Sequence, residues 1–267
     1  MRKIVYNYCM DADLLLAYLK GLPIPAARWL DATGSTNDDA ARWAASGAPD
    51  GALVVADRQE GGRGRMGRTW ITRPGGALAF SLILRLSQAE QPLLTLFSPL
   101  GAMAVADALE TVGLKPEVKW PNDVLLGQRK VCGILAEAAW LGDELQALVV
   151  GIGVNIAPSS IPPAEGLLYP AACVEEFLGQ SLDRFELLRR IMIALFQRRT
   201  QIGQFEFFTD WEARLAFKGQ TVVLSPPGEN AIRGKLLGVD AQGNLRLCDE
   251  DGTERIVTAG DLTLRPI

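Results

Sequence analysis

The feature that most limits how this chain can fold is a change in its sequence pattern at Phe217. Before Phe217, stretches with helical periodicity alternate with apolar stretches typical of strands. After it, short β-type runs separated by turn residues fill about 50 residues. This predicts an α+β fold, in which a mixed β-sheet with flanking helices covers residues 26–215. A small antiparallel β-barrel is expected over residues 217–267, and residues 1–25 form an N-terminal extension.

Capping residues, glycines and apolar runs locate the individual elements of the first 215 residues. Helices are expected over residues 11–20, 35–47, 96–114 and 183–200, with a further helix that ends in residues 211–215. Strands are expected over residues 51–57, 77–86, 116–120 and 145–156, with a hairpin over 124–140 that turns at Gly127-Gln128-Arg129. The stretches 58–75 and 157–170 are expected to be loops.

The composition excludes several kinds of chemistry. The chain has no histidine, which rules out an imidazole base, a Ser-His-Asp triad and a histidine-bound metal. Its four cysteines lie far apart in sequence, so we expect reduced thiols and a cytoplasmic location, with metal ligands unknown. No apolar stretch is long enough to span a membrane. The residues before the first predicted domain are too few for a DNA-binding module.

Residues 58–73 form a positive island in an acidic chain. The window holds five arginines and one glutamate, which gives +4, whereas 27 basic and 31 acidic residues give the whole chain −4. Four glycines in the window let the backbone approach a ligand closely. Arginine side chains bind phosphate or carboxylate oxygens in forked pairs. The island therefore predicts anion binding, and a solvated flexible loop is the alternative.

Lys119 follows an alternating strand pattern and directly precedes Trp120 and Pro121. Lysine is scarce, with seven in the chain. A lysine that points inward from a strand end would hold a carboxylate or an α-phosphate as a point charge. From spacing alone, an exposed lysine at the strand end is the stronger interpretation. Asp123, just beyond, is expected to be a turn residue.

Two further patterns have both a structural and a functional interpretation. Ser35, Thr36 and Asn37 begin a predicted helix, where they either cap the helix or present hydroxyl and amide groups to a polar ligand. Glycines interrupt the apolar strands at Gly133 and at 151–153. Such glycines mark either a close approach of the backbone to a ligand or a local bulge.

Taken together, these segments resemble the biotin protein ligase family. The matching residues, in order across residues 28–156, are Ser35-Thr36-Asn37, Gln59, Gly62 to Arg68 with Trp70, Lys119-Trp120-Pro121-Asn122-Asp123, Lys130 and Gly133. Met66 departs from the pattern, because many relatives carry another arginine there. The resemblance implies a class II synthetase-like, biotin–lipoyl ligase fold, with an SH3-like domain as the C-terminal barrel. Within the family, the chain resembles the ligase-only members, which lack a DNA-binding domain.

The resemblance also implies a reaction and the residues that perform it. Biotin and MgATP would give biotinyl-5′-AMP and pyrophosphate, and the biotinyl group would then pass to a lysine. The implied catalytic residues are Lys119, Arg63 and Arg65. Those implied for biotin are Ser35, Thr36, Asn37, Gln59, Gly62, Arg63, Gly64, Arg65, Lys119 and Gly133. Those implied for ATP and the adenylate are Arg65, Met66, Arg68, Trp70, Lys119, Asn122, Lys130 and Asn155.

The implied partner is the biotin carboxyl carrier domain of a carboxylase. No DNA or membrane partner is expected, and a homodimer is left open. Lipoate–protein ligase, of related fold and similar two-step chemistry, is the nearest alternative. An RNA-binding protein that uses the Gly/Arg loop is an alternative from another class. The acidic pI near 5.1 and the single short basic island count against it.

Overall fold

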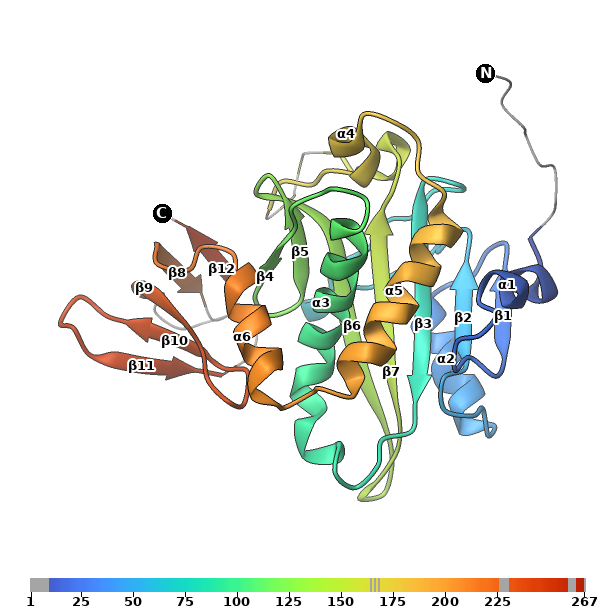
Figure 1. Ribbon diagram of the computed structural model, residues 1–267, viewed down its shortest axis with the longest axis horizontal. Helices are drawn as coiled ribbons and strands as arrows, with labels where there is room; N and C mark the ends of the chain where they lie inside the picture. The colour runs from blue at the N-terminus through green and yellow to red at the C-terminus, as the bar shows by residue number, and fades with distance from the viewer. Residues whose placement is uncertain are drawn as a thin grey trace.

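The protein is described from a computed structural model over residues 10–163, 165, 167, 169–225, 231–258 and 263–266. Its centre is a seven-stranded sheet with the strand order β1-β2-β3-β7-β6-β5-β4 (Figure 1). The strands are β1 (Ala27–Leu30), β2 (Leu53–Ala56), β3 (Ala77–Leu84), β4 (Glu117–Lys119), β5 (Asp123–Leu126), β6 (Arg129–Leu141) and β7 (Glu144–Asn155). β1 and β2 are parallel, and the other neighbouring pairs are antiparallel, which confirms the mixed sheet.

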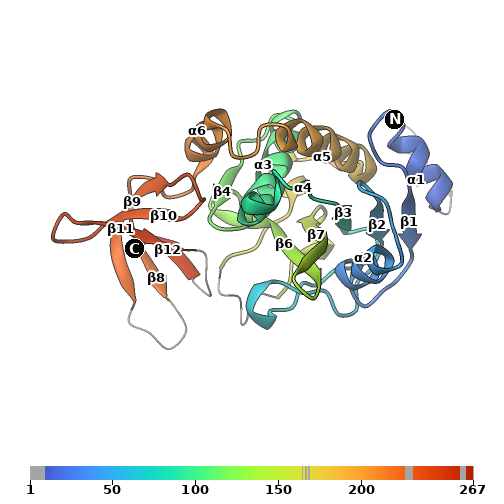
Figure 2. The same cartoon turned by 90° about the horizontal axis from the view of Figure 1, so that it is seen from below.

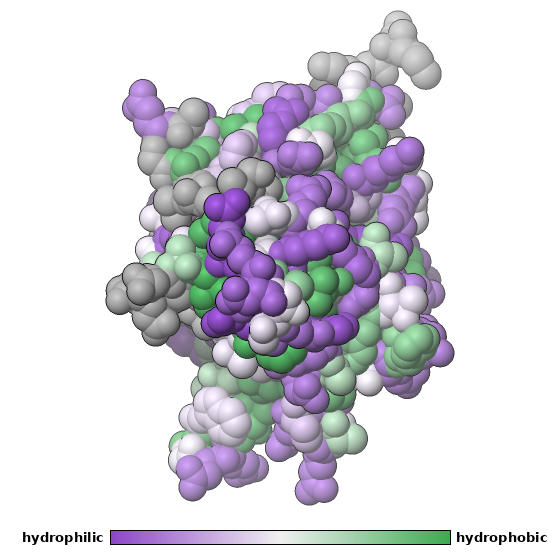
Figure 3. All heavy atoms as spheres, turned by 90° about the vertical axis from the view of Figure 1, so that its left-hand side faces the viewer, coloured by the Kyte–Doolittle hydropathy of each residue, from purple (hydrophilic) through white to green (hydrophobic). Residues whose placement is uncertain are grey.

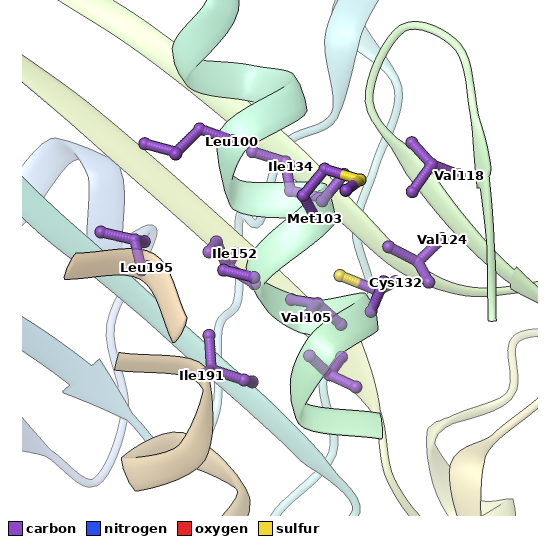
Figure 4. Close-up of a cluster of buried hydrophobic side chains, with 14 of the residues drawn as sticks. Leu100, Met103, Val105, Val118, Val124, Cys132, Ile134, Ile152, Ile191 and Leu195 are labelled. Atoms are coloured by element: carbon purple, nitrogen blue, oxygen red, sulfur yellow. The ribbon is translucent and has the colours of Figure 1, made fainter. Parts of the chain in front are cut away.

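Helices cover both faces of this sheet. They are α1 (Ala12–Tyr18), α2 (Thr36–Ala45), α3 (Phe97–Glu110), α4 (Val174–Leu178), α5 (Arg184–Arg199) and α6 (Phe205–Arg214). Figure 2 shows α3 and α5 on one face and α2 on the other. The larger core lies between the sheet and α3, where Met103 of the helix lies beside Ile134 of β6 (Figure 4). A smaller core joins α2 to alternate residues of β7, Ala147 and Val149.

A second sheet is formed by the C-terminal part of the chain. Its strands are β8 (Thr221–Ser225), β9 (Ile232–Val239), β10 (Leu245–Cys248), β11 (Glu254–Val257) and β12 (Thr263–Pro266), in the order β11-β10-β9-β8-β12. All its neighbouring pairs are antiparallel. Within the described residues no pairing joins β11 to β12, so the sheet is open and the expected closed barrel is not found. In Figure 3 this side of the molecule is mostly hydrophilic, with smaller hydrophobic areas between.

The two sheets share contacts. The indole Nε1 of Trp120, just beyond β4, donates to the carbonyl of Gly243 at 3.0 Å. The carboxylate of Glu212 in α6 accepts from the backbone N–H of Val239 in β9 at 3.0 Å. Trp211, Leu236 and Leu245 belong to the same buried cluster as the main core. The second sheet is therefore packed on the first through apolar side chains and hydrogen bonds.

Most predicted elements are present, and the differences are short elements. The hairpin turns at Gly127 and Gln128, both with left-handed φ, as a two-residue turn requires. Sequence patterns missed β1 and α4, whereas α6 ends at Arg214, inside the predicted 211–215. Both missed elements are only four or five residues long, which is too short for periodicity to appear.

Two predictions from composition are tested by burial. Within the described residues, one segment, Gln91–Glu110, is apolar and long enough to cross a membrane, but 67% of that window is buried inside the fold, where α3 is the core helix. Cys132, Cys173 and Cys248 are free thiols, the first two of them buried. Cys9 lies outside the described residues.

Candidate active site

A cavity of about 710 Å³ opens over the face of the sheet that α2 covers only in part. Its floor consists of glycines at alternate positions of β6 and β7, namely Gly133, Gly151 and Gly153. The register pairs Gly133 with Gly153 and Gly151 with Leu135. Because alternate residues face the same side of a sheet, these glycines leave one patch of strand backbone without side chains. The volume lies within the range of small-molecule sites.

The Gly/Arg loop folds over this cavity as a small hairpin, residues 62–70, called the Gly/Arg hairpin below. Its two arms meet where the Trp70 N–H donates to the Gly62 carbonyl at 2.8 Å and the Gly64 N–H donates to the Arg68 carbonyl at 2.7 Å. A Cβ on Gly62 would lie 2.4 Å from the Trp70 carbonyl oxygen, so only glycine fits there. The segment is a loop, as expected, but its paired backbone groups order it, which counts against the alternative of a flexible loop.

The tip of the hairpin is a single 3₁₀ turn, η1 (Arg65–Gly67), in which Met66 has φ 58°. Non-glycine residues adopt this left-handed conformation uncommonly. Met66 is also 43% exposed, and the Nη2 of Arg68 lies 3.4 Å from its sulfur. The tip thus presents two arginines and one methionine at the mouth of the cavity.

The first turn of α2 forms a polar wall of the cavity. Ser35 occupies the N-cap position, but its side chain makes no capping hydrogen bond. The backbone N–H and hydroxyl of Thr36 both donate to Gln59 Oε1, at 2.8 and 3.0 Å. The fully buried hydroxyl of Ser81 in β3 contacts Thr36 Oγ1 at 2.8 Å and Asn37 Oδ1 at 2.6 Å. The helix terminus therefore holds an ordered cluster of donors and acceptors.

Two lysines and one aspartate form the cationic end of the cavity. Lys130 Nζ lies 2.5 Å from Asp123 Oδ1, and Lys119 Nζ lies 3.8 Å from Asp123 Oδ2. The Lys119 side chain is only 7% exposed, so the interpretation of an exposed strand-end lysine is wrong. Asp123 begins β5 and shares its charge between both lysines instead of serving only as a turn residue. The cluster carries a net +1, which favours an anion in the cavity.

Tyr169, from the loop after β7, closes this end of the cavity. Its ring centroid is 5.1 Å from Lys119 Nζ, a cation–π distance. Burial, followed by the charges of Glu117 and Asp123, raises the pKa of Tyr169 to about 12. The phenol is therefore neutral at physiological pH.

Trp70, at the end of the hairpin, packs against the glycine floor. A Cβ on Gly153 would lie 2.5 Å from indole atoms, and one on Gly133 would lie 3.4 Å away. Lys130 Nζ is 5.5 Å from the ring centroid of Trp70. The indole Nε1 is buried, and within the described residues it has no hydrogen-bond partner. The indole thus occupies the space that the absent glycine side chains leave.

Arg63 lies on the outer rim of the cavity. Its Nη1 and Nη2 each lie 2.7 Å from one oxygen of Asp38, and its Nη2 is 3.5 Å from Glu137 Oε2. The hydrogen bonds from Arg63 hold the pKa of Asp38 below its ordinary value. Asp38 and Glu137, which lie outside the 58–73 window, therefore offset part of the positive charge counted for that window.

All but one of the residues implied by the resemblance line this cavity, the exception being Gly62, which lies behind it. Asn122 donates to the Ile134 carbonyl and Asn155 to the Ala172 carbonyl, so both amides also brace the backbone around the site. Sequence reasoning missed Glu137 and Tyr169 as members of the site, and gave Ser81 no role. Glu137 alternates with Leu135 and Gly133 on β6, a signal that would have put it on the cavity face. Among the described residues, no group of three or more Cys, Asp or Glu side chains is placed to hold a metal ion.

Comparison with known proteins gives one consistent family. Residues 29–155 match the model of the biotin/lipoate A/B protein ligase family. The chain is 35% identical to the biotin--[acetyl-CoA-carboxylase] ligase of Paracoccus denitrificans, over 85% of this chain and 96% of that protein. It is 34% identical to the bifunctional ligase/repressor BirA of Bacillus spizizenii, over 86% of this chain and 71% of that protein.

A solved structure also matches the fold. The biotin protein ligase from Aquifex aeolicus in complex with biotin and ATP superposes with a TM-score of 0.79 and 31% identity, over 91% of this chain and all of that chain. The chain therefore belongs to the biotin/lipoate A/B protein ligase family. Within this family it groups with the biotin protein ligases, because the relatives matched over most of their length carry that name.

Proposed function

We propose that the cavity binds biotin and MgATP and joins them into biotinyl-5′-AMP. The biotin carboxylate oxygen attacks the α-phosphorus of ATP, and pyrophosphate leaves. The ε-amine of a lysine on a biotin carboxyl carrier domain then attacks the acyl carbon. An amide forms, AMP leaves, and the amine gives up a proton. The Aquifex aeolicus neighbour, solved with both biotin and ATP, supports these two substrates.

The observation that carries this proposal is the arrangement of charge along one cavity. A neutral cluster of hydroxyl and amide groups at α2 meets an apolar floor of glycines and the Trp70 indole, and that floor meets the two lysines around Asp123. A ligand with a neutral polar head, an apolar body and an anionic end would match this order. Biotin has these three parts in its ureido group, its thiophane with valeryl chain, and its carboxylate.

The first step brings two anions together, and the positions of the cations explain how their repulsion is offset. Lys119 is buried on a strand, so its ammonium is held in place before the substrates arrive. A preorganised cation stabilises the charge that develops on the α-phosphate oxygens. Arg65, at the hairpin tip, would meet the phosphates from the opposite side. No histidine is required, because an acyl adenylate already carries a good leaving group.

The polar wall favours biotin over lipoate as the acid. Thr36, Asn37 and Gln59 supply both donors and acceptors at one end of the cavity. A ureido group needs both kinds of partner, whereas a dithiolane ring needs neither. Sites built to hydrogen-bond a polar group discriminate strongly against ligands that lack it. The dithiolane ring of lipoate would gain no hydrogen bond from these groups.

The test is mass spectrometry of a carrier domain incubated with the chain, MgATP and either biotin or lipoate. A mass gain of one biotinyl group, with biotin only, is the expected result. A lipoyl adduct of equal yield would assign the chain to the lipoate branch of the family. No adduct with either acid, together with no acid-dependent pyrophosphate exchange, would overturn the proposal.

The remaining features are proposed from the same resemblance. Residues 26–215 would form the catalytic domain and residues 217–267 an SH3-like domain that supports the carrier or the nucleotide. The free thiols of Cys132 and Cys173 suit a cytoplasmic enzyme. A carboxylase carrier domain is the proposed partner, without DNA or membrane, and a homodimer stays open.

A further inference from the structure

We propose that Asp38 and Glu137 are positioning residues, which hold the Gly/Arg hairpin over the cavity through Arg63. Neither carboxylate was implicated by the sequence. The inference deepens the proposed function, because it assigns to these two residues the retention of the reactive intermediate. The set of Asp38, Arg63 and Glu137 is called the clasp below.

The clasp joins three elements that are far apart in sequence. Asp38 lies in the first turn of α2, Arg63 in the first arm of the hairpin, and Glu137 in β6. Both terminal nitrogens of Arg63 contact Asp38 at 2.7 Å, in the forked geometry that arginine and carboxylate prefer. Glu137 approaches the same guanidinium to 3.5 Å from the sheet. The hairpin is thus tied at one residue to both walls of the cavity.

Glu137 connects the clasp to the buried polar wall. Its Oε2 also accepts from the side-chain amide of Asn37 at 2.6 Å. The other end of that amide, Oδ1, contacts the buried hydroxyl of Ser81. A Cβ on Gly151 would lie 2.1 Å from the same Oδ1, so the amide packs directly against the backbone of this glycine. The position of the hairpin is therefore coupled to the groups proposed to bind biotin.

This geometry changes the expected role of Arg63. Its guanidinium faces two carboxylates, and hydrogen bonds with Asp38 raise its pKa further. Its charge is thereby largely offset before any substrate binds. Arg63 therefore acts mainly as an anchor of the hairpin.

Loosening the anchor has a chemical consequence. An acyl adenylate is hydrolysed or lost when its site opens to water, and closed loops prevent this. The side chains of the clasp are each about 40% exposed, so each ion pair alone contributes modestly to holding the hairpin. The two carboxylates act on one guanidinium, and their removal together should free the hairpin more than either removal does.

The experiment uses the full chain and the variants Asp38→Asn, Glu137→Gln and their double. The matched control is Glu60→Gln, which removes an exposed ion pair with Arg58 at the start of the same loop. Two readouts are followed. One is the rate of trypsin cleavage after Arg65 and Arg68 without ligand. The other is the ratio of biotinyl-AMP released to pyrophosphate formed, with KM for biotin and kcat measured alongside.

We expect each single variant to raise hairpin cleavage and adenylate release about threefold, and the double about tenfold. KM for biotin should rise by a similar factor, while kcat at saturating biotin changes less than twofold. Glu60→Gln should match the unmodified chain, and Asp38→Glu, which keeps the charge, should restore most of the retention lost in Asp38→Asn.

Unchanged cleavage and release in the double variant would overturn the clasp. So would cleavage that rises equally at sites throughout the chain, because it would show general unfolding and not release of the hairpin. A chain that forms no adenylate at all would overturn the proposed function instead. The trypsin measurement without ligand would still decide the clasp in that case.

Discussion

The cavity has two cationic regions, and they are built in opposite ways. The lysine region stands on strands: Lys119 ends β4, Lys130 lies in β6, and both share the carboxylate of Asp123 in β5. The arginine region stands on the Gly/Arg hairpin, where the Arg63 side chain is 40% exposed and Met66 is 43% exposed. The lysine region is part of the sheet, whereas the arginine region lies on a hairpin that is joined to the sheet mainly at its base.

This difference assigns different tasks to similar charges. A charge that must stabilise a transition state is most effective when it is already in place, as on a strand. A charge that must admit substrates and then cover them is better placed on a segment that moves. Lysine gives a compact point charge and arginine a wide fork, which suits the same division. The lysine region should therefore control chemistry, and the hairpin should control retention.

The largest expected effect comes from the fixed region. Lys119→Ala removes the buried ammonium and leaves Asp123 with one cation fewer beside the substrate anions. Biotin-dependent pyrophosphate exchange should fall by about 100- to 1,000-fold or below detection. Lys115→Ala, which removes an exposed lysine just before β4, is the control and should keep full exchange. Exchange at the unmodified rate in Lys119→Ala would show that the buried lysine has no part in adenylation.

The next effect tests the arginine region. Arg65→Ala removes a guanidinium from the hairpin tip but leaves the lysine region intact, so adenylate should still form. Its release into solution, measured by trapping biotinyl-AMP during turnover, should rise about tenfold, with exchange reduced less than in Lys119→Ala. If Arg65→Ala instead abolished exchange and kept the adenylate bound, the division between the two regions would be reversed.

The two regions meet at Trp70, where a smaller effect should appear. Gly153→Ala adds a Cβ that would lie 2.5 Å from the indole, and the ring must move. We expect KM for ATP to rise about fivefold and the free energy of unfolding to fall by about 1–3 kcal/mol. Trp70→Phe in the same chain gives the added methyl group room, and should restore part of the lost stability in thermal unfolding. An additive loss in the double variant would show that the two residues do not meet.

The sequence predicted those parts of this site that depend on local pattern. The capping residues at Ser35, the strand before Lys119 and the glycines in the apolar strands all have local signals. The mixed sheet followed by a β-rich tail was also predictable, because periodicity and turn residues mark it. The resemblance then added roles to those residues.

The parts it missed depend on pairing between distant segments. Asp38 and Glu137 are about 100 residues apart, and only the packing of α2 on β3 and β7, next to β6, brings both to Arg63. Asp123 has the appearance of a turn residue until the pairing of β5 with β6 is known. That pairing sets Asp123 opposite Gly133 and leaves its carboxylate within reach of the Lys130 ammonium. β1 became part of the sheet through a parallel pairing with β2 that its four residues alone do not indicate.

The smallest effect concerns the position where this chain departs from the family pattern. Met66→Arg would place a second guanidinium close to that of Arg68, whose Nη2 now lies 3.4 Å from the methionine sulfur. Without ATP the two charges repel, and with ATP the phosphates offset them, so the gain on binding is partly cancelled. We expect KM for ATP to fall only about twofold at low salt and to be unchanged at high salt. Met66→Gln, which puts a neutral polar side chain at the same left-handed position, is the control. If Met66→Gln lowered KM equally, shape and not charge at the hairpin tip would set ATP affinity.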